Sequence, residues 1–153
     1  MTPETQIKQL ALSLPHVPKP THVYKPVVIT GNLVYISGHG PLKDDGKYIT
    51  GVVGKDLDIE AGRHAARQCG LALLSTLRDE LGSLDRIGRV IKTLGMVNSA
   101  PDFYEHPKVI NGFSELMAEV FGQDAGIGAR SAVGMGPLPG NIAVEVEAIF
   151  ELH

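Results

Sequence analysis

The stretch that decides the fold is ARSAVGMGPLPGNIAVEVEAIFEL, which runs from Ala129 to Leu152. In its second half apolar residues alternate, so one face of a strand carries positions 144, 146, 148 and 150, and the other carries Glu145, Glu147 and Ile149. Residues 136–141 (GPLPGN) are rich in turn formers. We therefore predict a hairpin that pairs 131–135 antiparallel with 142–150 and brings Arg130 near Glu145 or Glu147. The register stays open, because a shift of one residue moves every side chain to the opposite face.

The composition is that of one folded domain spanning residues 1–153. The chain is 43% hydrophobic and 20% charged, which is too apolar for a disordered protein. Its net charge of −3 and its scattered basic residues predict no nucleic-acid partner. Cys69 is the only cysteine, and no apolar run approaches the roughly 20 residues that cross a bilayer. The first residues do not resemble a signal peptide, so we expect a cytoplasmic protein with no membrane partner.

The remaining segments alternate between strand-like and helix-like patterns. Residues 1–19 are predicted to form a leading helix and a proline-stiffened connector. The segments that follow are strands at 24–30 and 33–37, a helix from Asp58 to Leu81, a strand at 89–99 and a helix at 110–121. This order predicts an α+β sandwich, strand-strand-helix-strand-helix-strand-strand, with both central helices on one face of a mixed sheet. One domain has nothing left to cover the other face, which predicts association between copies.

Three stretches in this order and at these spacings resemble a known family: ITGNLVYISGHGPL (29–42), INGFSELMAEVFG (110–122) and ARSAVGMGPLPGNIAVEVEAI (129–149). The family is the RidA or YjgF superfamily of reactive-intermediate deaminases. The resemblance implies a chorismate-mutase-like fold and a homotrimer around a central barrel, with active sites in the clefts between subunits. It also implies hydrolysis of small 2-enamino or 2-imino acids, such as 2-aminoacrylate and 2-iminobutanoate, to a 2-keto acid and ammonia. No metal or organic cofactor is expected.

The resemblance assigns roles to seven positions. It implies that Arg130 holds the substrate carboxylate and that Glu145 positions water, and its substrate-binding positions are Tyr24, Ser37, Gly38, His39 and Asn111. The planar guanidinium of arginine binds a carboxylate through two charge-assisted hydrogen bonds, so the residue type suits the role. An imine carbon is already electrophilic and needs only a polarised water. That agrees with a sequence that lacks a Ser-His-Asp pattern.

Two departures from the family pattern leave the substrate open. His39 stands where many members have glutamine, and Ala132 stands where many have cysteine or another polar residue. The leading helix and the extended loop FYEHPKVIN (103–111) further indicate a longer subfamily. Alternatives to the small imino acids are therefore an aminomuconate-like catabolite, or a trimer that binds small carboxylates without turnover. The acidic net charge argues against endoribonuclease activity.

The same residues also have purely structural interpretations. Arg130 and Glu145 are each compatible with an ion pair, and Glu145 with plain solvation. Tyr24 is compatible with packing over the first hairpin, and Asn111 with capping the second central helix. Cys69 falls on the apolar stripe of the long helix, which indicates an inert core residue. The six histidines show no metal-site spacing, and His39 alone is a candidate proton carrier.

Overall fold

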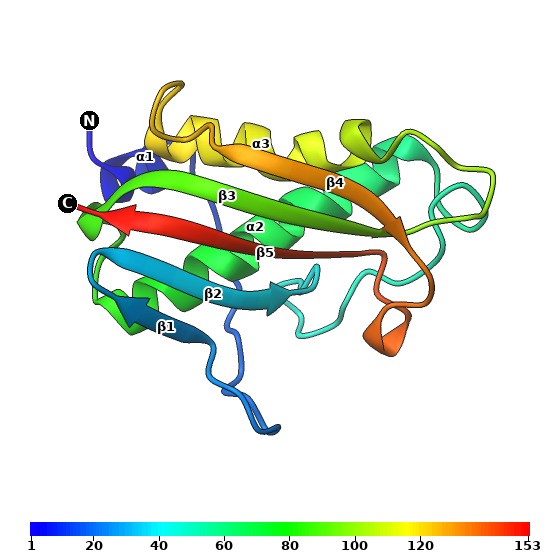
Figure 1. The fold of residues 1–153 in the computed structure, drawn as a ribbon, viewed down its shortest axis with the longest axis horizontal. Coiled ribbons are helices and arrows are strands. Elements are labelled where there is room, and N and C mark those ends of the chain that lie inside the picture. Colours follow the sequence, from blue (N-terminus) through cyan, green and yellow to red (C-terminus); the bar gives the residue numbers. More distant parts are fainter.

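A mixed sheet forms one layer of the protein, and two long helices cover one of its faces (Figure 1). The computed structural model describes residues 1–153. Its strands are β1 (Val27–Thr30), β2 (Leu33–His39), β3 (Ile87–Asn98), β4 (Ala129–Met135) and β5 (Val144–Leu152). Its helices are α1 (Pro3–Gln9), α2 (Ile59–Leu81) and α3 (His106–Phe121), with short 3-10 turns η1 (Leu84–Arg86) and η2 (Pro139–Asn141). The predicted α+β architecture and order of elements are confirmed.

The alternation in the last strand places its two faces as predicted. Val144, Val146, Ala148 and Phe150 are buried against the helices. Glu145 and Glu147 therefore lie on the opposite, helix-free face. The sheet order is β1-β2-β5-β3-β4, so β5 is central and β4 forms an edge.

The predicted hairpin between 131–135 and 142–150 is wrong. β4 pairs in parallel with β3, and β5 lies on the other side of β3, antiparallel to it. The link 136–143 therefore spans two strand spacings, about 10 Å, instead of making a tight turn. Helix α3 forms the crossover between two parallel neighbours, which requires β4 to run in the direction of β3. Arg130 consequently lies beside Thr93 of β3, and its predicted proximity to Glu145 or Glu147 does not occur within the chain.

The ends of α2 follow the local signals in the sequence. Asp58 caps the helix by accepting a hydrogen bond from the amide of Ala61 at 2.8 Å. Gly82 ends it in the left-handed conformation, with φ of 82°. α2 packs closely on α3 at Gly112, where a Cβ atom would overlap the backbone carbonyl of Arg63. The long helices are thus fixed at a separation that only glycine permits.

Helix α3 begins earlier than predicted. It starts at His106 and has Pro107 in its first turn, a position that tolerates proline because the missing amide has no partner in the helix. Asn111 therefore lies inside the helix, and its interpretation as a helix cap is wrong. The leading helix is shorter than predicted and ends at Gln9.

The leading helix is attached to the far end of α2. Glu4 accepts hydrogen bonds from Arg78 Nε at 3.1 Å and Nη2 at 2.7 Å, and from the Leu84 amide at 2.9 Å. The Glu4 amide in turn donates to Asp85 Oδ1 at 2.9 Å. We call this set of contacts the Glu4 clamp. It holds α1 against η1, while residues 10–26 lead away towards β1.

None of the helices combines the length and the apolar character that a membrane crossing requires.

Candidate active site

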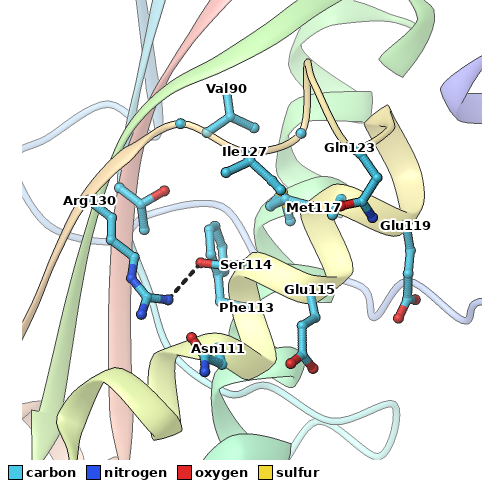
Figure 2. A pocket seen from close by; sticks show the side chains of 14 residues that line it. Val90, Asn111, Phe113, Ser114, Glu115, Met117, Glu119, Gln123, Ile127 and Arg130 are labelled. Carbon is cyan, nitrogen blue, oxygen red and sulfur yellow. Dashed lines mark hydrogen bonds between the residues drawn. The ribbon is translucent and has the colours of Figure 1, made fainter.

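Arg130 lies at the edge of the sheet and points into a groove between β4 and α3 (Figure 2). Its Nη1 donates to Ser114 Oγ at 3.1 Å, and its Nη2 donates to the Pro107 carbonyl at 3.3 Å. Asn111 lines the same groove, whose volume is about 530 Å³. The structure thus brings together two of the predicted site residues, Arg130 and Asn111. Thr93 and Ser114 also line this groove.

The charge of Arg130 is not neutralised by any carboxylate. Two glutamates line the groove, but both are engaged elsewhere: Glu115 pairs with Arg63 at 2.6 Å and Glu119 with Arg67 at 2.8 Å. The partners of Arg130 are a hydroxyl and a carbonyl, which orient the guanidinium without cancelling its charge. The ion-pair interpretation of Arg130 is therefore wrong within the chain. A fixed, partly exposed guanidinium of this kind suits an anionic ligand.

Glu145 and Gly38 form a second feature, on β5 and β2. The carboxyl group of Glu145 lies directly over Gly38, where a Cβ atom would overlap its Oε2 and come within 3.0 Å of its Cδ. The ladder between β2 and β5 is irregular here, because Ile36 pairs with Ala148 and His39 with Val146, which leaves an extra residue on β2. Such a bulge changes the direction of neighbouring side chains and is common beside active sites.

The local environment favours the neutral form of Glu145. Burial raises the pKa of its carboxyl group, and the nearby Glu147 carboxylate raises it further. Glu145 makes no ion pair, so nothing opposes these two effects. A carboxyl group with a raised pKa is a stronger base once ionised, which suits it to proton transfer near neutral pH.

Three other predicted residues surround Gly38. Tyr24 is half exposed at the end of the connector and lines a cavity of about 940 Å³ together with Gly38 and His39. We call this space the connector cavity, since residues 16–22 form much of its wall. Ser37 donates from Oγ to the Lys25 carbonyl at 2.7 Å, so its hydroxyl holds the connector against β2.

His39 is buried and both of its ring nitrogens have partners. Nδ1 lies 2.7 Å from the Ser37 carbonyl, which can only accept, so Nδ1 carries the hydrogen. In the neutral ring Nε2 then accepts from the Thr76 hydroxyl at 2.8 Å. Burial lowers the pKa of His39, which favours this neutral form. The ring thus joins β2 to α2, and no free nitrogen is left for proton transfer in this arrangement.

The two groups of site residues do not meet within one chain. β2 and β4 are three strand spacings apart, about 14 Å, because β5 and β3 lie between them. In addition, Arg130 points towards α3 on the helix-covered side, whereas Glu145 lies on the helix-free face. A site that uses both residues therefore requires a second copy of the chain.

Sequence reasoning missed Ser114 as a partner of Arg130. Ser114 is three residues after Asn111, and residues with this spacing lie on the same side of a helix, so the signal was present. Cys69 is fully buried, and burial raises the pKa of its thiol well above the usual value. No group of three or more His, Cys, Asp or Glu side chains is arranged to hold a metal ion.

Comparison with known proteins identifies the family. Residues 4–150 match the family model described as "YjgF/chorismate mutase-like, putative endoribonuclease". The chain is 41% identical to Protein TCP17 of Trypanosoma cruzi over 147 residues, which covers 96% of this chain and 92% of that protein.

Two solved structures are closely similar over nearly the whole chain. The protein Atu1372 of Agrobacterium tumefaciens, whose function is unknown, is 42% identical, with a TM-score of 0.88 over 99% of this chain and 92% of its own. A structure from Shewanella oneidensis described as a "putative endoribonuclease" is 31% identical, with a TM-score of 0.93 over 99% and 100% of the two chains. Both alignments extend into the leading helix. The chain therefore belongs to the YjgF/chorismate-mutase-like family, in a form that includes this helix.

Proposed function

We propose that the protein hydrolyses small 2-imino or 2-enamino acids to 2-keto acids and ammonia, at a site completed by a second copy of the chain. The observation that carries this proposal is the Arg130 guanidinium, which is held in an open groove with no carboxylate partner. A guanidinium so placed binds the carboxylate that such substrates share. The family resemblance supports the same assignment.

Glu145 supplies the proton transfers in this proposal. The substrate enamine takes up a proton at Cβ to give the iminium ion, and water adds to the iminium carbon while the ionised Glu145 accepts a proton from that water. The same carboxyl group returns that proton to the nitrogen of the carbinolamine, the C–N bond breaks to release ammonia, and the ionised Glu145 takes up the hydroxyl proton as the carbonyl forms. No electrons leave the system and no covalent enzyme intermediate forms. Because its pKa is raised, the Glu145 carboxyl group is suited both to accept the proton from water and to return it to nitrogen.

The geometry of the sheet supports assembly between copies. A hollow of about 440 Å³ lies on the helix-free face, and its apolar residues include Val28, Tyr35, Leu94 and Ile149. Val28 and Tyr35 are half exposed there, as expected for a face that packs against another subunit. We propose a homotrimer in which the helix-free faces meet, and in which Arg130 of one copy approaches Gly38 and Glu145 of another. Light scattering tests this proposal, since it requires about three times the chain mass of 16.3 kDa.

The activity is tested by following the loss of freshly generated 2-aminoacrylate and 2-iminobutanoate with and without the protein. We expect the protein to accelerate ammonia release and Arg130→Ala to lower kcat/KM by about 100-fold or more, as for the loss of a hydrogen-bonded charge. Arg86→Ala is the matched control, because Arg86 is an exposed arginine of η1 that lines neither the groove nor the connector cavity and lies outside the sheet. An Arg130→Ala variant as active as wild type would refute the carboxylate assignment.

The same experiment separates the alternatives. Binding of 2-oxobutanoate without turnover would identify a carboxylate-binding trimer, and turnover of aminomuconate alone would identify that substrate class. RNA cleavage that depends on Arg130 would favour the endoribonuclease activity named in the family description. Against that activity, Arg63 and Arg67 on the helical surface are already paired with glutamates and offer no free cationic patch for phosphates.

A further inference from the structure

Tyr48 is a residue of the connector cavity that the family motifs do not include. It lines the cavity with Tyr24, Gly38 and His39 and is 44% exposed. Its ring lies against Gly40, where a Cβ atom would come within 3.1 Å of two ring carbons. The Glu145 carboxyl group occupies the corresponding space at Gly38. Tyr48 and Glu145 are therefore placed over two nearby glycines of one short backbone segment.

The backbone around Tyr48 is firmly held. Residues 43–47 form a turn in which the Lys43 amide donates to the Lys47 carbonyl at 2.9 Å and the Gly46 amide donates to Lys43 at 3.0 Å. Asp45 Oδ1 accepts from the Lys47 amide at 2.9 Å, and Leu42 bridges Tyr48 in antiparallel fashion. A side chain on such a base is positioned before any ligand arrives, which reduces the entropy that binding must remove.

The cavity beside Tyr48 is large, and its surface is a mixture of polar and apolar groups. Its volume of about 940 Å³ lies towards the upper end of the roughly 300–1,000 Å³ usual for ligand pockets, far more than 2-aminoacrylate fills. Only five of its eighteen lining residues are hydrophobic. Gly38 lies under the Glu145 carboxyl group and also in the wall of this cavity, so a substrate bound at Gly38 would adjoin this space. The polar residues of the wall, Tyr48 among them, can hydrogen-bond to a polar group on the side chain of that substrate.

We propose that Tyr48 is a specificity-determining residue, whose hydroxyl donates a hydrogen bond to a polar group on the side chain of a 2-imino acid. This inference rests on the proposed function and narrows its substrate class to imino acids with polar side chains. Burial and the neighbouring Tyr24 phenol raise the pKa of Tyr48, so the phenol is neutral and retains its hydrogen at physiological pH. A neutral phenol is a suitable donor to a hydroxyl, amide or carboxylate oxygen.

The test compares two imines of almost the same size, generated by an amino-acid oxidase from homoserine and from norvaline. The homoserine-derived imine ends in a hydroxyl group, whereas the norvaline-derived imine ends in a methyl group. We expect wild type to prefer the homoserine-derived imine, and Tyr48→Phe to reduce its kcat/KM about 10-fold, the usual effect of losing one hydrogen bond. Activity on the norvaline-derived imine should stay within about twofold, because the ring still packs on Gly40.

Tyr104→Phe is the matched control, since Tyr104 is 79% exposed and lines neither the groove nor the connector cavity. It should leave both activities unchanged. If Arg130→Ala abolishes turnover but Tyr48→Phe leaves the ratio of the two substrates unaltered, the inference about Tyr48 is overturned and the proposed function stands. If wild type deaminates neither imine nor 2-aminoacrylate, both are overturned.

Discussion

Substituting Gly38 with alanine tests the placement of Glu145 without altering Glu145 itself. Gly38 does not have a positive φ, so its backbone conformation is open to alanine. The added methyl group would overlap Glu145 Oε2 and approach Cδ to 3.0 Å, which forces the carboxyl group to move by about 1 Å to restore a normal contact. The displaced atoms belong to the end of a flexible side chain. The fold should therefore tolerate the change.

The expected loss of activity is large compared with the expected change in stability. A displacement of about 1 Å of a catalytic group lowers the rate about 100-fold, which corresponds to about 2.7 kcal/mol in the activation free energy. The free energy of unfolding should stay the same or rise by about 0.4–1 kcal/mol, because alanine restricts the unfolded chain. Steady-state deamination kinetics and thermal unfolding of the same preparation measure the two quantities.

A double-mutant cycle makes the reasoning refutable. If Gly38→Ala acts through the carboxyl group, it should cost about 100-fold in the wild-type chain and almost nothing in a Glu145→Ala background. An equal loss in both backgrounds would show that Gly38 acts independently of Glu145. Unchanged activity of the single variant would show that the position of this carboxyl group does not matter for the reaction.

Two further predictions concern pH and helix packing. Because the Glu147 carboxylate contributes to the raised pKa of Glu145, Glu147→Gln should lower that pKa and shift the acid limb of the pH–kcat/KM profile to lower pH; an unshifted limb would contradict this role. Gly112→Ala should lower the free energy of unfolding by a net 1–2 kcal/mol, roughly, and the melting temperature by about 3–6 °C, because overlap with the Arg63 carbonyl outweighs the gain in helix propensity. Gly136→Ala, at a glycine with open space around it, should leave the melting temperature almost unchanged, and equal melting of the two variants would refute the packing argument.

Local patterns predicted the parts of the fold that depend on neighbouring residues. The alternation in 144–150 placed the buried and exposed faces of β5, and Asp58 and Gly82 marked the ends of α2. These signals depend on backbone hydrogen bonds and side-chain period within one element. They can therefore be recognised in the sequence without knowledge of the tertiary structure.

The pairing of the last two strands was not predicted correctly, because it depends on elements far apart in the sequence. The turn formers at 136–141 suggested a hairpin, yet a strand, a helix and a second strand on one sheet require a parallel pair, and β3, α3 and β4 form such a unit. The location of Arg130 depends on that pairing, and so does its separation from Glu145. The family motifs indicated the candidate site residues. They did not indicate that, within one chain, Arg130 and Asn111 lie in one groove while Gly38 and Glu145 lie elsewhere, on β2 and β5.

The Glu4 clamp has a consequence for the connector cavity, although no residue of α1 lines it. Residues 10–26 are anchored at both ends, by α1 at one end and by β1 at the other. Fewer conformations are therefore open to them than to a terminal segment with one free end. A segment anchored at both ends loses less conformational entropy than a free one when it becomes ordered around a ligand. The leading helix thus makes the connector a fixed wall of the cavity, and the clamp lies close to it, because Arg78 adjoins Asp79 and Glu80 of the cavity wall.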